Sequence, residues 1–300
     1  PLPSPPPPAV PLVIDSETPL ADRLFDLRGP DVVGLIVELS LPADLELNAT
    51  EPFAFDSRIT ASEVVISGLG GASAIWAWGG GSSRRRLTAA GSRRLFVVRA
   101  GGPRITLRGL VLSNGVHVAG GELIIESCRF EGSQAATGGA VLVTGGRLDA
   151  RDTSFVGNQA EAGGAVLVSG GIASFANCRF ESNVADLGGA LFVNGTADVV
   201  LSDATLLTGN TAHNSSSVWF VGGSLLYRLP APLGRWINGG PEAELLAVGG
   251  GCGPGNRTWL SPVQRVRSRP PLSRDRRLSS DFPYPCSPGL VGEDNAEATQ

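Results

Sequence analysis

Residues 138–143 read Gly-Gly-Ala-Val-Leu-Val, and nearly the same six residues return at 163–168 and 188–193. Three phenylalanines recur at the same interval of 25 residues: Phe130, Phe155 and Phe180. A fixed period of this length is typical of a solenoid, in which each repeat buries its apolar face only against neighbouring repeats. The sequence therefore predicts a stack of coils of about 25 residues each.

Each repeat contains a short strand of alternating apolar residues that ends at a glycine turn. We expect these strands at residues 116–118, 141–143, 166–168, 191–193 and 218–220. A second alternating strand follows each of the first three turns, as at residues 123–126. Upstream, residues 105–112 match residues 123–130 at a shorter step of 18. Because no helical period separates these strands, we expect coils that stack at about 4.8 Å and pair with both neighbours.

Two kinds of side chain recur at positions expected to point into the stack. The apolar position is filled by Phe130, Phe155, Phe180 and Leu207. Three residues after each of these stand Ser133, Asn158, Asn183 and Asn210. A buried asparagine at a repeated turn can bridge its amide to the adjacent coils. The pattern therefore predicts a parallel β-helix with an apolar stack and an asparagine ladder inside it.

The Gly-Gly-Ala-Val/Leu and Phe-x-x-Asn elements alternate, and they are similar to the repeats of chlamydial polymorphic outer membrane proteins. The resemblance covers roughly residues 105–223, and Ser133 and Leu207 depart from its pattern. It implies a right-handed parallel β-helix of the pectin-lyase-like group and a surface-exposed, adhesive domain. We therefore expect an all-β, right-handed, single-stranded parallel β-helix of about six regular coils. An irregular N-terminal cap and an irregular C-terminal tail should flank these coils.

The composition divides the chain into three parts. Residues 1–10 are rich in proline and are expected to form an extended linker. The β-helix should span residues 11–228, with irregular cap coils over 11–95 and regular coils over 96–228. Residues 229–300 lose the period, are rich in proline and arginine, and could lead into a cysteine-rich module.

Composition also argues against several partners. The formal net charge of −4 gives no reason to expect nucleic acid. No apolar run reaches the roughly 18 residues of a membrane-spanning helix. No phosphate-binding glycine loop is recognisable, so no cofactor is expected. The chain begins with proline and contains no methionine, which indicates a fragment or a mature segment.

Candidate catalytic residues are few. Only Glu161 and Asp186 form a pair of acids at equivalent positions of adjacent coils. Two such carboxylates could share a proton or bind Ca²⁺, or they could be two solvated loop acids. The two histidines, His117 and His213, have no Cys, His or acid partner at ligand spacing in the sequence, so no metal site is expected. The motifs of polygalacturonase-like enzymes are absent, and the pattern does not favour an enzyme.

The cysteines and glycosylation sequons bear on the compartment. Cys128 and Cys178 lie two coils apart, about 9.6 Å, which exceeds the roughly 7 Å Cα limit for a disulfide, so we expect buried free thiols. Cys252 and Cys286 lie in the tail and are expected to form a disulfide, which would imply an oxidising compartment. Four sequons fit a secreted glycoprotein, at Asn48, Asn194, Asn214 and Asn256.

Alternation within the first strand of each coil predicts a row of outward-pointing residues. The row consists of His117, Leu142, Leu167, Phe192 and Trp219. An outward row would ordinarily be polar, so an apolar one suggests a covered face. The cover could be the chain's own residues 229–236, or a partner protein or saccharide, and simple exposure is the third alternative.

These patterns favour a non-enzymatic scaffold, extracellular or at the cell surface, with an adhesive role. Two alternatives stay open. One is a polysaccharide lyase or glycoside hydrolase on the same fold, and the other is a purely structural spacer.

Overall fold

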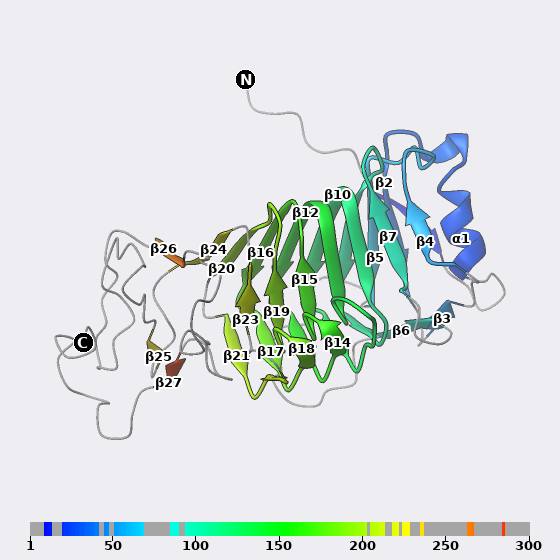
Figure 1. The fold of residues 1–300 in the computed structure, drawn as a ribbon. Coiled ribbons are helices and arrows are strands. Elements are labelled where there is room, and N and C mark those ends of the chain that lie inside the picture. Colours follow the sequence, from blue (N-terminus) through cyan, green and yellow to red (C-terminus); the bar gives the residue numbers. More distant parts are fainter. Residues whose placement is uncertain are drawn as a thin grey trace, which may run out of the picture.

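Short parallel strands separated by glycine turns wind into a parallel β-solenoid of about six turns (Figure 1). The predicted fold class is therefore confirmed. The computed structural model describes residues 9–13, 20–41, 45–47, 51–68, 85–89, 94–202, 205–213, 218–221, 224–228, 235–236, 263–266 and 284–285.

The largest sheet contains two columns of strands, which β10 and β12 join by running through both. We call one the row column, because it carries the outward row: β4 (Phe53–Phe55), β7 (Phe96–Arg99), the first part of β10 (Val116–Glu126) and of β12 (Val141–Arg151), β15 (Val166–Val168), β19 (Leu191–Val193) and β23 (Val218–Phe220).

The other column of this sheet is called the charged column. It contains β1 (Ala9–Val13), β2 (Ile36–Ser40), β5 (Glu63–Ser67), β8 (Arg104–Arg108), the second part of β10 and β12, β16 (Ile172–Ala176), β20 (Asp198–Ser202) and β24 (Ser224–Arg228). All its pairs are parallel except the last, in which β26 (Val263–Val266) runs antiparallel to β24.

Three smaller sheets complete the fold. The second sheet contains β3 (Leu45–Leu47), β6 (Arg85–Ala89), β9 (Leu110–Leu112), β11 (Arg129–Glu131), β13 (Ser154–Val156), β17 (Arg179–Glu181) and β21 (Leu206–Thr208). The third contains β14 (Gln159–Ala162), β18 (Val184–Leu187) and β22 (Thr211–Ala212). The fourth pairs β25 (Arg235–Trp236) with β27 (Tyr284–Pro285).

The strand registers match the steps expected from the sequence. Val116 pairs with Val141, which pairs with Val166 in the next coil. The shorter step is also confirmed, because Leu123 pairs with Ile105. The stack continues further upstream than the regular pattern suggested, since β4 pairs with β7 and β5 pairs with β8.

The N-terminal cap contains a helix that the strand pattern did not predict. This helix is α1 (Leu20–Asp26), and a short 3-10 turn, Pro30–Val32, follows it. Leu24 and Leu27 are both fully buried, and α1 lies at the end of the solenoid in Figure 1. Apolar side chains one helical turn apart form a buried stripe, which favours a helix at this place.

The interior holds the predicted apolar stack. The rings of Phe130 and Phe155 stack with centroids 5.2 Å apart, and those of Phe155 and Phe180 with centroids 4.7 Å apart. Leu207 continues the stack and is fully buried. Phe175, from the charged column, contacts Phe180 edge-on at 5.3 Å. The repeated apolar position is therefore the centre of the core.

The predicted asparagine ladder is also present. The Asn183 side-chain oxygen accepts hydrogen bonds from the backbone N–H and the side-chain amide of Asn158, both at 2.9 Å. Its own amide nitrogen donates to the Phe155 carbonyl at 2.9 Å and to the Asn210 side-chain oxygen at 2.8 Å. Each amide thus ties one turn to the turns on either side.

Both cysteines in the described coils are buried free thiols, as expected. The Cys178 thiol donates to the carbonyl of Ala150, and burial raises its pKa to about 12. It is therefore protonated and unreactive at neutral pH. Cys252 and Cys286, the expected disulfide, lie outside the described residues, as do Asn48, Asn214 and Asn256.

Candidate binding surface

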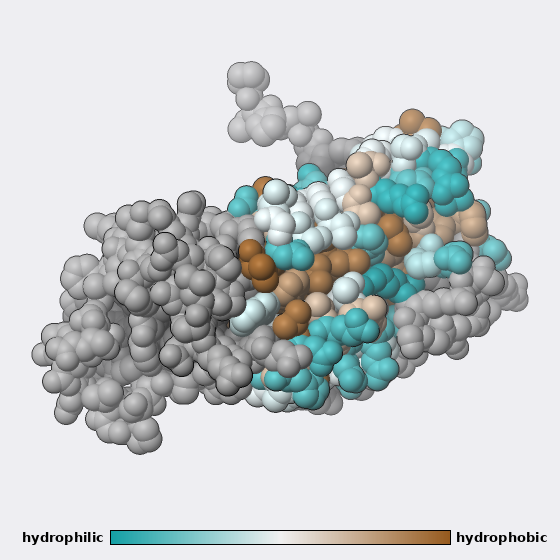
Figure 2. All heavy atoms as spheres, in the orientation of Figure 1, coloured by the Kyte–Doolittle hydropathy of each residue, from teal (hydrophilic) through white to brown (hydrophobic). Residues whose placement is uncertain are grey.

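The five residues of the predicted row lie next to one another on consecutive coils. Their strands pair His117 with Leu142, Leu142 with Leu167, Leu167 with Phe192, and Phe192 with Trp219. We call this set the apolar row. Figure 2 shows the resulting band of hydrophobic residues over β12, β15 and β19, with hydrophilic residues on its lower side.

Burial along the apolar row is uneven. Leu167 and Phe192 are only 6% and 8% exposed, whereas His117, Leu142 and Trp219 are half-buried. The same row extends upstream through Val97, which pairs with His117, and Ala54, which pairs with Val97. Sequence reasoning missed these two positions, although the alternating strand at residues 96–99 carries the signal.

A polar column borders the apolar row on one side. Thr144, Ser169 and Asn194 each follow the last residue of a row strand, and backbone hydrogen bonds join these segments from coil to coil. Asn194 is the one predicted glycosylation site in the described part of the chain. It lies in the turn after β19, half-buried, and its side-chain oxygen is enclosed without a hydrogen-bond partner there.

Basic groups gather at the upstream end of the apolar row. The His117 ring nitrogen Nε2 lies 2.9 Å from the Thr144 hydroxyl. Burial, followed by the positive charges of Arg94 and Arg99, lowers the pKa of His117 below its ordinary value. The imidazole is therefore mostly neutral at pH 7, between two cations.

The side chain of Arg94 replaces backbone N–H donors that are missing from the short coil, which is the coil with the 18-residue step between β8 and β10. In the regular coils, the N–H groups of Gly138 and Gly139 donate to the carbonyls of Ala162 and Gly163 in the next coil. The chain passes from β9 to β10 through residues 113–115 alone, so no strand of the third sheet and no Gly-Gly corner exists in that turn.

The guanidinium of Arg94 fills the place of that corner. Its Nη2 donates to the carbonyls of Thr137 and Gly138, which are the equivalents of Ala162 and Gly163 one coil earlier. Its Nη1 donates to the Val116 carbonyl at 3.2 Å. Burial lowers the pKa of Arg94 to about 10, which still leaves it protonated at neutral pH.

Changing Arg94 to methionine should therefore destabilise the solenoid by about 2–3 kcal/mol, because three carbonyls lose a charged donor and those of Thr137 and Gly138 lose the donor that replaces a backbone N–H. Lysine should restore only part of this, since an ammonium group cannot reproduce the planar fork of donors. Denaturant unfolding followed by circular dichroism measures the effect. Wild-type stability in the methionine variant would contradict this role.

The candidate acids lie on the third sheet, on the other side of the Gly-Gly corners. Glu161 on β14 and Asp186 on β18 are both exposed and occupy neighbouring coils. His213 Nδ1 lies 3.1 Å from Asp186 Oδ1, because β18 and β22 pair Ala185 with Ala212. The expectation that His213 has no acid partner was therefore wrong. The coil that separates them is 27 residues long instead of 25, and the longer step hides the pair in the sequence.

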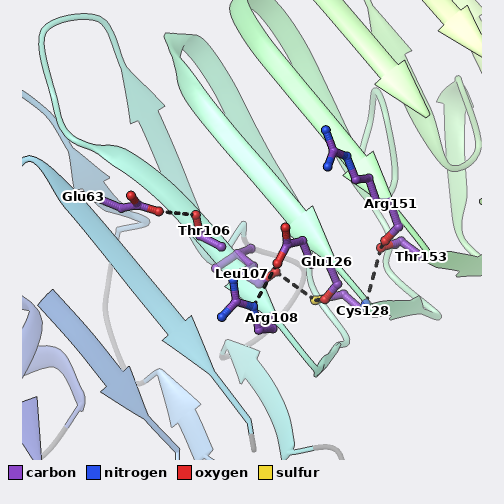
Figure 3. A network of polar contacts seen from close by, with 8 residues as sticks. All are labelled: Glu63, Thr106, Leu107, Arg108, Glu126, Cys128, Arg151 and Thr153. Carbon is purple, nitrogen blue, oxygen red and sulfur yellow. Dashed lines mark hydrogen bonds and ion pairs between the residues drawn. The ribbon is translucent and has the colours of Figure 1, made fainter. Parts of the chain in front are cut away.

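The charged column carries alternating ion pairs between coils. Arg104 Nε lies 3.0 Å from Glu122 Oε2, and Arg108 Nε lies 2.9 Å from Glu126 Oε2. Figure 3 shows Arg108 beside Glu126, and Glu63 accepting a hydrogen bond from Thr106 at 2.8 Å. Ion pairs this exposed contribute little stability. This face therefore offers a salt-bridged surface, in contrast to the apolar row.

No protein-family model, curated protein or solved structure matches this chain. The protein class that the coils define is a parallel β-solenoid. Among the described residues, no helix is long and apolar enough to cross a membrane. In the same part of the chain, no group of three or more His, Cys, Asp or Glu residues is placed to hold a metal ion.

Proposed function

We propose that this protein is a non-enzymatic scaffold that binds a partner through the apolar row, outside the cell or at its surface. We further propose that the solenoid is a right-handed β-helix of the pectin-lyase-like group. Its repeats would then be related to those of the chlamydial polymorphic outer membrane proteins. The observation that carries it is the unbroken apolar row across consecutive coils.

The apolar row suits binding by side chains, because the backbone N–H and C=O groups of its strands are already hydrogen-bonded to neighbouring strands. Every row strand between β7 and β19 has a parallel neighbour on each side, so a ligand would contact side chains and would not need to add a strand. Apolar side chains contribute about 25 cal/mol for each Å² removed from water. A rigid face of this kind loses little conformational entropy when it binds.

The alternative of a polysaccharide lyase or hydrolase rests on Glu161 and Asp186. Such chemistry needs carboxyl groups whose surroundings drive their pKa values apart. The Asp186 side chain is 55% exposed and pairs with His213, which is itself exposed. This arrangement resembles a solvated surface pair more than a catalytic one.

The test replaces the half-buried members of the apolar row. A double variant, Leu142→Ser and Trp219→Ser, removes apolar surface while sparing the more deeply buried Leu167 and Phe192. The matched control is Ile172→Ser, which removes an apolar side chain 42% exposed on the charged column. Each purified protein is applied to an array of synthetic peptides and an array of defined glycans.

We expect wild type and Ile172→Ser to bind the same ligands and the double variant to lose them. Hits that survive in the double variant, or an absence of any hit, would contradict the proposal. Cleavage of a polysaccharide by the wild type that disappears in Asp186→Asn would instead support the enzyme alternative. Circular dichroism confirms that each variant is folded before it is compared.

A further inference from the structure

We infer that the partner is a protein segment with a carboxylate beside apolar side chains, and that the carboxylate binds at Arg99 and His117. This inference rests on the proposed function and adds the chemistry of the ligand. Basic groups lie at one end of the apolar row, whose other members are uncharged.

The strand register places these groups across the row. Arg99 ends β7 and pairs with Ala119 and Gly120 of β10, so only a methyl group and a glycine lie beside it on the next coil. Its side chain is exposed and has the same parity as Val97, which points outward. His117 is thus flanked by Arg99 toward the strand end and by the Arg94 guanidinium toward the strand start.

Charge distinguishes this place from most of the arginines on the regular coils. Arg104, Arg129 and Arg147 each lie within 3.0 Å of a carboxylate oxygen. In the ranges that the structure describes, neither Arg94 nor Arg99 forms an ion pair, and no acid contributes to the pKa of His117. A carboxylate from a ligand would supply the missing negative charge, with charge-assisted hydrogen bonds.

The remainder of the apolar row favours a peptide over a saccharide. Leu142, the half-buried aliphatic residue beside His117, complements an apolar side chain better than the hydroxyl-rich surface of a sugar. From His117 to Trp219 the row rises about 19 Å, at about 4.8 Å for each coil. An extended peptide of about six residues covers that length at about 3.3 Å per residue.

Binding should also be linked to protonation. A bound carboxylate favours the imidazolium, so it raises the pKa of His117 from its lowered value. The groups that face His117 are Arg94, Arg99 and Thr144. Affinity for a carboxylate should therefore increase as the pH falls through the His117 pKa, while the carboxylate of the peptide remains ionised.

The test uses two acetylated and amidated octapeptides that differ only in charge. One reads Asp-Asp-Leu-Ser-Leu-Ser-Leu-Ser, and in the other both aspartates are asparagines. Imidazole C–H signals in NMR spectra report binding, because His117 and His213 are the two histidines of the chain. His213 directly follows β22 of the third sheet and pairs with Asp186 there, so it serves as the internal control. The variants are Arg99→Gln and, as the matched control, Arg104→Gln on the charged column.

At pH 6.5 and low salt, the aspartate peptide should bind about tenfold more tightly than the asparagine peptide and should shift His117 but not His213. Arg99→Gln should abolish that difference, and Arg104→Gln should preserve it. Equal affinities for the two peptides would overturn the carboxylate site and leave the proposed function standing. Binding of neither peptide, together with a glycan hit that depends on the apolar row, would overturn the peptide and leave a saccharide partner.

Discussion

Changing Asn183 to alanine should lower the free energy of unfolding by about 4 kcal/mol. The side chain is fully buried, and its removal leaves the Asn158 backbone N–H without an acceptor, takes one donor from the Phe155 carbonyl and breaks the side-chain bonds to Asn158 and Asn210. Each buried group left unsatisfied costs about 1–3 kcal/mol. Because each coil is held only by its neighbours, the loss in the middle of the ladder should weaken the stack on both sides. Urea unfolding followed by circular dichroism measures it.

The control for this variant is an asparagine on the same coil that is not in the ladder. Asn177 occupies a turn with φ of 52°, and its amide donates to Asp152 at 2.8 Å. Glycine tolerates this conformation, so Asn177→Gly should change stability by less than about 1 kcal/mol. Equal losses in the two variants would mean that the interior ladder has no special role.

Changing Gly164 to alanine should destabilise the protein by about 4 kcal/mol or more, because the added methyl group overpacks the contact between two coils. A Cβ atom there would lie 2.1 Å from the Gly189 carbonyl oxygen and 2.6 Å from that of Val184. Both obstacles are backbone atoms of the next coil, so no side-chain rotation can relieve the clash. The coils would have to separate, which breaks hydrogen bonds such as the one from the Gly164 N–H to the Gly188 carbonyl at 3.0 Å. Thermal and urea unfolding both report the loss.

Gly157 is the matched control for Gly164. Its φ is +61°, and nothing lies within 4 Å of a Cβ placed on it. Gly157→Ala should therefore cost only about 1–2 kcal/mol, the strain of a left-handed backbone. The equivalent position one coil later is Ser182, which holds a φ of 54°. If Gly157→Ala were as damaging as Gly164→Ala, backbone conformation would matter more here than close coil stacking.

The regular coils could be predicted from the sequence because one spacing sets several contacts at once. A step of 25 residues places Phe130, Phe155 and Phe180 in one stack and aligns Leu142 with Leu167. The same spacing places Cys128 and Cys178 two coils apart, which is too far for a disulfide, and both are free thiols. These contacts follow from the period alone, since stacked parallel strands bring equivalent residues together.

Other contacts could not be predicted because they depend on where the period changes. The partner of His213 is hidden by a longer coil, and the pairing of β4 with β7 spans a long insertion. Arg94 is a further case: its guanidinium substitutes for backbone donors of a corner that the short coil omits. Because the short coil omits the Gly-Gly corner altogether, the repeat pattern contains no position from which the role of Arg94 could be inferred.

The most direct test of the binding surface is a calorimetric titration of the strongest array ligand into wild type, the Leu142→Ser and Trp219→Ser double variant, and Ile172→Ser. Loss of apolar contacts at two positions should weaken the complex with the double variant at least tenfold, or about 1.4 kcal/mol. Ile172→Ser should bind as the wild type does. An unchanged dissociation constant in the folded double variant would contradict the assignment of binding to the apolar row.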